Sequence, residues 1–253
     1  PGYGAGTRIG CESGDPLTFK TFEEFYDAFM RQYKYQINLC QEHMLVAERI
    51  LAQEHQMPLF TMMTTDAIEK GEDVVAGGAI LNSGPHYMLT GVADLGDSLE
   101  VIKKLVFDDK AITMEELLKA VTADFEGYED IRHMCINVPK YGNDIDEVDM
   151  LTSKALQDCA EYCATLKCGR AGNYSSAGVQ PTQTNVAMGE MCWALPSGRK
   201  ALTPLADTLS AEQHMDVNGP LAALHSYGKI NHSACTNGTI LNMWISKSDL
   251  VVE

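Results

Sequence analysis

The chain has 253 residues, 45% of them hydrophobic, and its 35 Asp and Glu residues outnumber 19 Lys and Arg, for a formal net charge of −16. This composition can bury a sizeable core, so a disordered chain is excluded and one α/β unit is expected. The acidic balance argues against a nucleic-acid partner, because affinity for phosphates rests on Lys and Arg. The apolar runs fall short of the roughly 20 residues that span a bilayer, and no secretory signal is visible, so we expect no membrane partner and a cytoplasmic location.

The chain contains eight cysteines. Without a secretory signal they are expected to be reduced thiols and not disulfides. Cys159 and Cys163 lie one helical turn apart and Cys168 follows, yet no Cys-x-x-Cys pair or histidine with zinc spacing accompanies them. The acidic segment 143–149 lacks the glycine and glutamate of an EF-hand calcium loop, and acids near the positive end of a helix dipole explain it more simply. We therefore predict no metal site.

Residues 20–58 are dominated by a predicted long helix. Thr21 followed by Glu24 is typical of a capping box at its start, and Pro58 is expected to close the region. Apolar residues spaced by three and four positions predict one buried stripe: Phe22, Phe25, Phe29, Tyr33, Ile37, Cys40 and Met44. A second helix is expected over residues 62–70.

The middle of the chain alternates loops and helices. Residues 74–97 are glycine-rich and predict short β-like pieces or loops of the kind that carry function. Asp97 and Ser98 are predicted to cap a helix that runs to residue 107. Thr113 with Glu116 predicts a capping box for a helix to residue 125. Further helices are expected over residues 128–136 and from the acidic segment to about residue 166.

The last third changes to a strand-like period. We expect strands over residues 175–180, 185–193 and 239–245, a turn at 196–198 and a helix over 220–227. Helices followed by strands predict part of an α/β barrel or wound sheet, within one domain that shows no internal repeat or linker.

Several blocks of sequence, in a fixed order, carry a resemblance to a known family. They are Gly14-Asp15-Pro16 with Phe19 and Phe22-Glu23-Glu24-Phe25; Gly96-Asp97-Ser98-Leu99 with Lys103-Lys104-Leu105-Val106-Phe107-Asp108; Pro139-Lys140-Tyr141-Gly142-Asn143-Asp144; Pro196-Ser197-Gly198-Arg199-Lys200-Ala201; Pro204-Leu205-Ala206-Asp207; and Gly219-Pro220 with Lys229-Ile230 and Asn237-Gly238-Thr239. Together they cover almost the whole chain. They resemble the glycyl radical enzymes of the pyruvate formate-lyase-like family, on the dehydratase and decarboxylase branch.

The resemblance implies a fold and a set of partners. The fold is a ten-stranded α/β barrel of two five-stranded half-barrels, heavily helical on the outside, and residues 1–253 resemble a single partial domain from the second half. The chain is thus expected to be an internal part of a larger enzyme. No cofactor is expected in this part, whereas the full enzyme would carry a glycyl radical installed by an S-adenosylmethionine and iron–sulfur activase. The implied partners are a small-molecule substrate, that activating enzyme and, for the full-length protein, a second copy in a homodimer.

Two residues resemble the radical carriers of the family without matching them. Cys11 is followed directly by Glu12, whereas the thiyl motif Gly-Cys-x-Glu has its acid two residues on. Gly172 precedes an asparagine and is out of register with Arg-Val-x-Gly-Tyr of the radical loop. We predict no catalytic residue in this chain, with the thiyl cysteine and the radical glycine expected outside it.

Barrel enzymes place specificity at strand ends and inward loops, which selects residues 82–94 and 179–185 as pocket loops. Their polar and aromatic side chains are the substrate-pocket candidates: Asn82, His86, Tyr87, Thr90, Gln180, Thr182 and Gln183. Each could instead satisfy backbone groups of an irregular loop. Many members of the family have Gly-Gly-Ala-Glu-Tyr where residues 77–81 are Gly-Gly-Ala-Ile-Leu, so a different substrate is expected.

For the whole enzyme the resemblance implies radical-based elimination or decarboxylation of a small organic substrate, with cleavage of a C–O, C–N or C–C bond. Two alternatives stay open. One is a formate C-acetyltransferase of the pyruvate formate-lyase type. The other, of a different class, is a non-catalytic product of a truncated or split gene. The segment alone is expected to be inactive.

Overall fold

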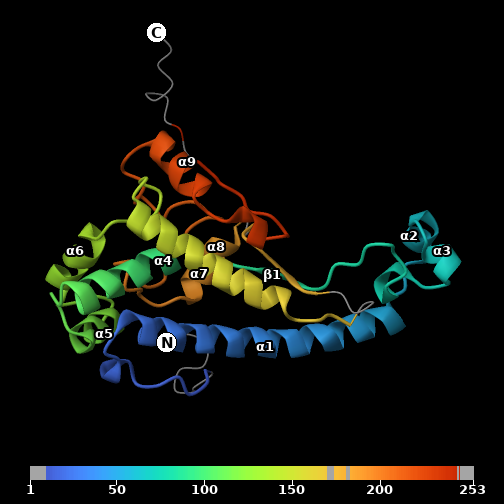
Figure 1. Ribbon diagram of the computed structural model, residues 1–253, viewed down its shortest axis with the longest axis horizontal. Helices are drawn as coiled ribbons and strands as arrows, with labels where there is room; N and C mark the ends of the chain where they lie inside the picture. Colours follow the sequence, from blue (N-terminus) through green and yellow to red (C-terminus); the bar gives the residue numbers. More distant parts are fainter. Residues whose placement is uncertain (1–9, 170–173, 181–182, 244, 246–253) are drawn as a thin grey trace, which may run out of the picture.

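A computed structural model of the chain describes residues 10–169, 174–180, 183–243 and 245. Its elements follow one another in the order shown in Figure 1. They are the 3-10 helix η1 (Pro16–Thr18), α1 (Phe22–Glu54), α2 (Pro58–Met63), α3 (Ala67–Lys70), the 3-10 helix η2 (Val74–Ala76), β1 (His86–Met88), α4 (Val92–Val101), the π-helix η3 (Ile102–Asp108), α5 (Met114–Thr122), α6 (Glu129–Asn137), α7 (Asp146–Ala164), β2 (Ser176–Gly178), α8 (Thr184–Met191), α9 (Pro220–Gly228) and the 3-10 helix η4 (His232–Ala234).

The long helix α1 begins where the sequence predicts. The Thr21 hydroxyl accepts a hydrogen bond from the Glu24 N–H, at 3.3 Å, and the Glu24 carboxylate accepts one from the Lys20 N–H, at 2.7 Å. Unpaired N–H groups of the first turn are thereby satisfied. Pro58 does not close α1, which ends at Glu54, but opens α2, where its missing N–H costs nothing. The helix expected over 62–70 is two short helices, α2 and α3, separated by a left-handed residue at Asp66.

Only the first part of the predicted stripe on α1 is core. Its members up to Ile37 are buried or pack against the core, whereas Cys40 is exposed and Met44 largely so. Beyond Ile37, α1 buries Gln41 and Glu48 instead. The Gln41 amide donates to the Lys167 carbonyl, and the Glu48 carboxylate accepts from the Gly169 N–H. The first part of α1 packs against the apolar core, whereas its later part faces backbone groups of residues 167–169 that need hydrogen-bond partners. Polar residues therefore replace the apolar stripe there.

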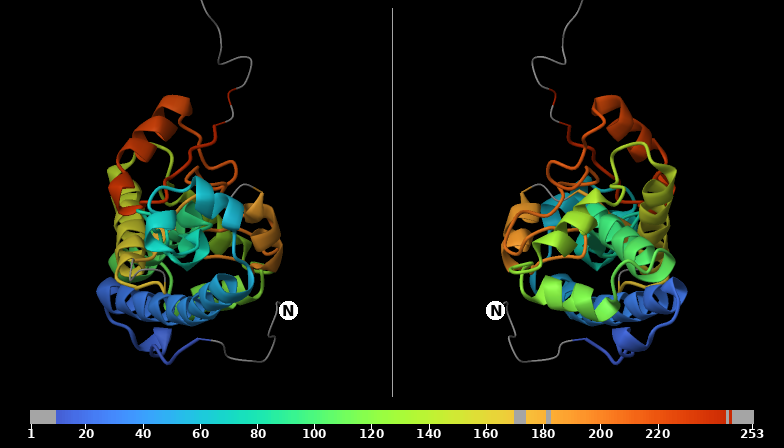
Figure 2. Two further views of the ribbon diagram at one scale, coloured as in Figure 1. Left: turned by 90° about the vertical axis from the view of Figure 1, so that its right-hand side faces the viewer. Right: turned by 90° about the vertical axis from the view of Figure 1, so that its left-hand side faces the viewer.

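Helices surround the body of the molecule. The end-on views show α1 along its base, with α7 on one side and α8 on the other (Figure 2). Helix α4 packs closely against α7, where Gly96 faces Thr152. Asp97 and Ser98 lie within α4 and do not cap it, contrary to the prediction. Their side chains accept from the Tyr141 N–H at 2.8 Å and from the Ser197 N–H at 3.3 Å, so partners distant in sequence take the place of a helix start.

A small parallel sheet lies within the helices. In the register of β1 with β2, His86 pairs with Ser176 and Met88 with Gly178. Residues 237–240 run alongside β2 in the same direction: the Asn237 N–H donates to the Ala177 carbonyl, and the Ile240 N–H to the Val179 carbonyl. The predicted strand 175–180 is therefore confirmed at its centre. Of the strand expected over 239–245, the described residues keep one bridge, between Val179 and Thr239.

The strand expected over residues 185–193 is wrong, because this segment contains helix α8. Asn185 is tied twice to Leu205: its carbonyl accepts from the Leu205 N–H and its amide donates to the Leu205 carbonyl. Gly189 also lies so close to the Thr203 carbonyl that a Cβ there would meet it at 2.3 Å. The pairing partner is thus a loop and not a strand. An α/β chain is confirmed, while the ten strands expected for a whole barrel stay a prediction.

Candidate functional site

The carboxyl ends of three parallel segments meet at one edge of the sheet. Ligands of α/β proteins bind outside such ends. Because β1, β2 and residues 237–240 run the same way, Thr90, Gln180 and Leu241 follow the three segments at this edge. The two loops selected from the sequence, 82–94 and 179–185, are neighbours in space.

One face of the sheet is open along β1, whereas the residues of β2 on the same face are buried. His86 and Met88 are exposed on it, and the His86 ring nitrogen Nδ1 is hydrogen-bonded to the Ser176 hydroxyl. The other ring nitrogen, Nε2, offers one further hydrogen-bonding position in either tautomer. Gln180 lies over the neighbouring segment, where its amide donates to the Asn237 carbonyl. In this register His86 lies opposite Ser176 at the amino end of β1, whereas Gln180 lies four residues beyond Ser176, past the carboxyl end of β2.

The opposite face of the sheet belongs to the core. Tyr87 lies there, buried, and its hydroxyl donates to the Gln41 side chain, whose oxygen also accepts from the Ser175 hydroxyl. Burial raises the pKa of Tyr87 to about 12. The remaining candidates are dispersed. Asn82 donates to the Gly77 and Ala79 carbonyls in its own loop, Gln183 is exposed before α8, and Thr182 lies outside the described residues.

A cavity of about 340 Å³ opens beside the carboxyl end of β1, between α1 and α4. Phe25 and Phe29 form part of its apolar wall, and Thr90 lines it together with Asp94. Asp94 is 1% exposed; one carboxylate oxygen accepts from the Ala206 N–H at 2.7 Å, and the other has no hydrogen-bond partner. Burial raises the pKa of this carboxyl. The sequence interpretation included Thr90 but missed Asp94.

The blocks that carry the family resemblance converge behind this cavity on a buried charge network. Three carboxyl groups, those of Asp94, Asp97 and Glu212, face two cations, Lys140 and Arg199, and all five residues are at most 5% exposed. Burial raises the pKa of Asp97 and lowers that of Lys140. With three acids and two bases, one carboxyl can stay protonated without an unpaired charge. Sequence spacing could not bring these residues together, because they come from four different segments.

Replacing Glu212 with glutamine should stabilise the protein increasingly as the pH rises. Burial, followed by the negative charge of Asp94, raises the pKa of Glu212 from 4.5 to about 7. The native state holds a proton that the unfolded chain releases, so this group makes stability fall between pH 4.5 and 7. Glutamine removes that loss. We expect the variant's advantage in urea unfolding to grow by about 1–3 kcal/mol between pH 5 and pH 8.

Glu116→Gln is the matched control. Hydrogen bonds from the Thr113 backbone and side chain lower the pKa of the exposed Glu116 carboxyl from 4.5, so this group affects the pH dependence of stability only below that range, and its replacement should have the same effect at pH 5 and pH 8. An advantage of Glu212→Gln that is equal at the two pH values would contradict a proton held by the native state.

The remaining sequence features lie apart from the sheet. The Cys11 thiol contacts the Arg31 carbonyl beside α1, and Gly172 lies outside the described residues. The eight cysteines all lie in the described residues and form no disulfide, and Cys163 contacts the Tyr33 hydroxyl. In the described part of the chain, no group of three His, Cys, Asp or Glu side chains could hold a metal ion. None of the described helices is both long and apolar enough to cross a membrane.

The acidic segment before α7 has an internal cation. The Lys229 ammonium lies 2.7 Å from a carboxylate oxygen of Asp144, 2.7 Å from one of Asp146 and 2.9 Å from one of Asp149. The acids also stand at the start of α7, as expected. The cluster joins the end of α9 to the start of α7.

Comparisons with known proteins give a single family. The model of the pyruvate formate lyase-like family matches residues 3–189. Trans-4-hydroxy-L-proline dehydratase of Clostridioides difficile is 37% identical over 95% of this chain and 30% of its own length. Isethionate sulfite-lyase of Oleidesulfovibrio alaskensis is 33% identical over 87% of this chain and 26% of its own. A solved structure concerned with 1,2-propanediol dehydration in Roseburia inulinivorans is 36% identical, with a TM-score of 0.90, over 94% of this chain and 31% of its own.

The chain thus spans about 30% of the length of the dehydratase that it matches. Three-quarters of its residues fall within the family model, and its fold superposes on that of a far longer chain. The relatives are enzymes that eliminate a hydroxyl or a sulfite group, as their names state. The chain belongs to the pyruvate formate lyase-like family of glycyl radical enzymes, on its dehydratase branch.

Proposed function

We propose that this chain supplies part of the second half of the barrel of a glycyl radical lyase, which eliminates a small leaving group from a small organic substrate. The observation that supports the proposal is the set of three parallel segments, with exposed His86 at the amino end of β1 and Thr90 and Gln180 at the carboxyl edge. Open faces and strand ends of such sheets are where α/β enzymes bind substrates. The thiyl and glycyl radicals of such an enzyme would come from residues outside this chain, after activation by an S-adenosylmethionine and iron–sulfur activase.

The residues described here would bind and orient the substrate. His86 is held by Ser176 through Nδ1, which leaves Nε2 to hydrogen-bond a substrate oxygen. Gln180 could bind a second polar atom, and Thr90 stands at the same edge. Tyr87 would hold β1 against α1 on the core face of the sheet, and Asn82 would stabilise the preceding loop. The substrate class is that of the relatives: hydroxylated or sulfonated small molecules with a leaving group next to a carbon bearing an abstractable hydrogen.

The test uses a version of the chain extended at both ends to the length of its relatives and activated anaerobically. It is screened against small diols, hydroxylated amino acids and hydroxyalkyl sulfonates, and elimination products are measured. His86→Ala and Gln180→Ala should each lower kcat/KM by about tenfold or more, the value of one hydrogen bond. His225→Ala is the matched control, because this exposed histidine pairs with Asp144 away from the sheet.

Three results would contradict the proposal. Formation of acetyl-coenzyme A and formate from pyruvate would identify the acetyltransferase instead. Reading frames that stop at both edges of the segment would identify a non-catalytic product. Unchanged kcat/KM in both variants would remove the open face from the substrate site. We further propose a reducing cytoplasmic location and a homodimer for the extended protein, on the basis of the family.

A further inference from the structure

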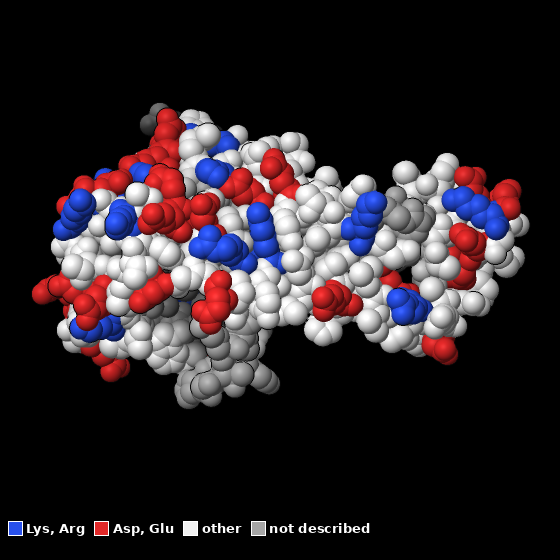
Figure 3. All heavy atoms as spheres, turned by 60° about the horizontal axis from the view of Figure 1, so that its bottom comes forward, with Lys and Arg blue, Asp and Glu red and all other residues white. Residues whose placement is uncertain are grey.

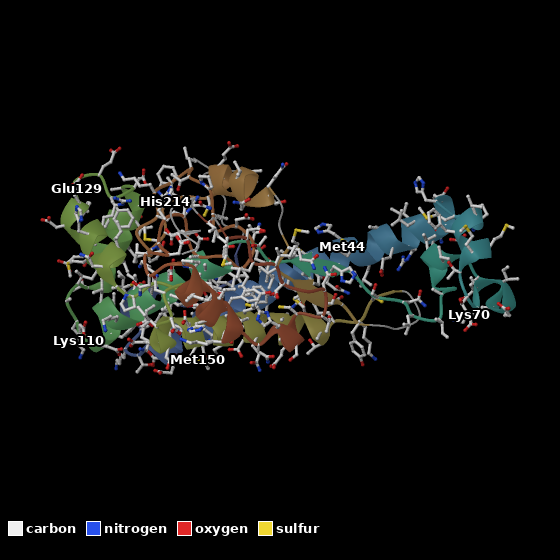
Figure 4. All side chains as sticks on the ribbon, turned by 90° about the horizontal axis from the view of Figure 1, so that it is seen from above. Met44, Lys70, Lys110, Glu129, Met150 and His214 are labelled. Atoms are coloured by element: carbon white, nitrogen blue, oxygen red, sulfur yellow. The ribbon has the colours of Figure 1, made fainter. Side chains whose placement is uncertain are left out.

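Residues 57–81 form an arm that lies away from the body. The arm contains α2, α3 and η2, and it extends beyond the last turns of α1 (Figure 1). In the view from above, Lys70 marks its far end, whereas Met150 and His214 mark the body (Figure 4). Within the arm, α2 packs against α3, and η2 packs against α1.

The arm has a defined shape. The Asp73 carboxylate accepts hydrogen bonds from the Met57 N–H at 2.9 Å, the Thr61 hydroxyl at 2.7 Å and the Val75 N–H at 3.0 Å. The Lys70 ammonium donates to the Ala79 carbonyl at 3.0 Å. These hydrogen bonds connect separate parts of the arm, so the arm keeps one conformation without a bound partner.

That surface is strongly apolar. Eight large hydrophobic side chains of the arm are at least 46% exposed: Met57, Leu59, Phe60, Met62, Met63, Ile68, Ile80 and Leu81. Leu81 reaches 87% and Met63 79%. Water-facing apolar groups of this number in one small region indicate an interaction surface. Exposed Glu69 and Glu72 accompany them, and in Figure 3 charged side chains stand at the far end of the arm.

The length of the relatives indicates what covers this surface. The structure from Roseburia inulinivorans superposes on 94% of this chain, and the unmatched 6% is smaller than the arm, which holds 25 of the 253 residues. At least ten of the arm's 25 residues therefore lie within the part that superposes on a protein of which this chain matches only 31%. Such a protein contains additional polypeptide that can cover the arm.

We propose that the apolar face of the arm is a docking surface for the polypeptide that flanks residues 1–253 in a protein of its relatives' length. The complementary surface is apolar at its centre, with Lys or Arg opposite Glu69 and Glu72. This docking is intramolecular and independent of the substrate chemistry proposed above.

Methionine oxidation by hydrogen peroxide tests the proposal, because the rate follows exposure of the thioether. Met62 and Met63 report on the arm, Met150 on an exposed part of α7, and Met30 on the core. Rates are measured by mass spectrometry in the 253-residue chain and in the extended chain, each relative to a methionine peptide in the same reaction. In the 253-residue chain, Met62 and Met63 should react at least as fast as Met150. In the extended chain their rates should fall by about tenfold or more.

Measurements at different protein concentrations distinguish the two polypeptides that can bind the arm surface, the flanking polypeptide of the same molecule and a second copy of the chain. Protection in the extended chain that is the same at low and high concentration supports the intramolecular surface. Protection that appears only at high concentration, in either version, identifies a second copy and overturns the proposal. Equal rates in the two versions overturn it as well.

A paired substitution gives an independent measurement. Met62→Glu with Met63→Glu should leave the melting temperature of the 253-residue chain unchanged, because both side chains are already in water, but should lower that of the extended chain. Met150→Glu is the matched control. An unchanged melting temperature of the extended variant would contradict docking, and a variant that fails to fold only when extended would support it. None of these readouts depends on catalytic activity.

Discussion

Gly96→Ala is expected to lower the free energy of unfolding by about 2–3 kcal/mol. Helix α4 crosses α7 so closely that a Cβ at Gly96 would lie 1.9 Å from the Thr152 hydroxyl oxygen and 2.8 Å from the Thr152 Cβ. Thr152 is fully buried and its hydroxyl donates to the Val148 carbonyl, so it cannot move aside. The two helices would have to separate, and urea unfolding followed by circular dichroism measures the cost.

The matched control is Gly228→Ala in α9, where nothing lies within 4 Å of the added Cβ. That change should be neutral or slightly stabilising, since alanine favours a helix. Thr152→Ala should restore part of the loss in the Gly96→Ala background, because it removes the nearest oxygen. If the two substitutions were simply additive, the helices would not be in the tight contact described here.

Arg199→Leu is expected to cost about 3–5 kcal/mol, the range for breaking a buried charge network. The guanidinium of Arg199 donates to four backbone carbonyls, those of Gly189, Trp193, Thr203 and Pro204. Its Nε also lies 3.9 Å from the Asp94 carboxylate. Leucine would leave the Trp193, Thr203 and Pro204 carbonyls without this donor and Asp94 without its cation, and chemical unfolding at pH 7 should show the loss.

Arg199→Lys and Lys119→Leu complete the comparison. A single ammonium cannot reach four carbonyls, so lysine at position 199 should recover only part of the stability. Lys119 forms an exposed pair with Glu115, and its replacement should leave stability nearly unchanged. Full recovery by lysine would mean that charge alone, and not the planar fork of donors, holds the loop after α8.

Local signals in the sequence were sufficient where neighbours in the chain supply the partners. The capping box of α5 is confirmed: the Thr113 hydroxyl accepts from the Glu116 N–H at 3.2 Å, and the Glu116 carboxylate accepts from the Thr113 N–H at 2.8 Å. Both bonds lie within four consecutive residues, so no tertiary contact can override them. Helices α6 and α7 also form where the sequence predicts them.

The wrong predictions fall where distant residues decide. Asp97 is typical of a helix cap, but the Tyr141 N–H reaches it from another segment and the helix begins earlier. Residues 185–193 alternate like a strand, yet their hydrogen bonds go to the loop at Leu205.

The same limit applies to the candidate site. His86 and Gln180 could be selected from their loops, whereas the pairing of His86 with Ser176, 90 residues away, could not. Asp94 and Glu212 were also missed, because a carboxyl that is buried and paired in the fold has the same appearance in sequence as a surface acid.

The parallel register of β1 has one more consequence. Among the described residues, β1 has β2 as its strand neighbour on one side and no strand on the other. An unpaired edge presents a row of N–H and C=O groups that invites another strand. The sheet can therefore grow past β1, so a further strand of a closed barrel would add there, and the same edge leaves the 253-residue chain open to edge-to-edge aggregation.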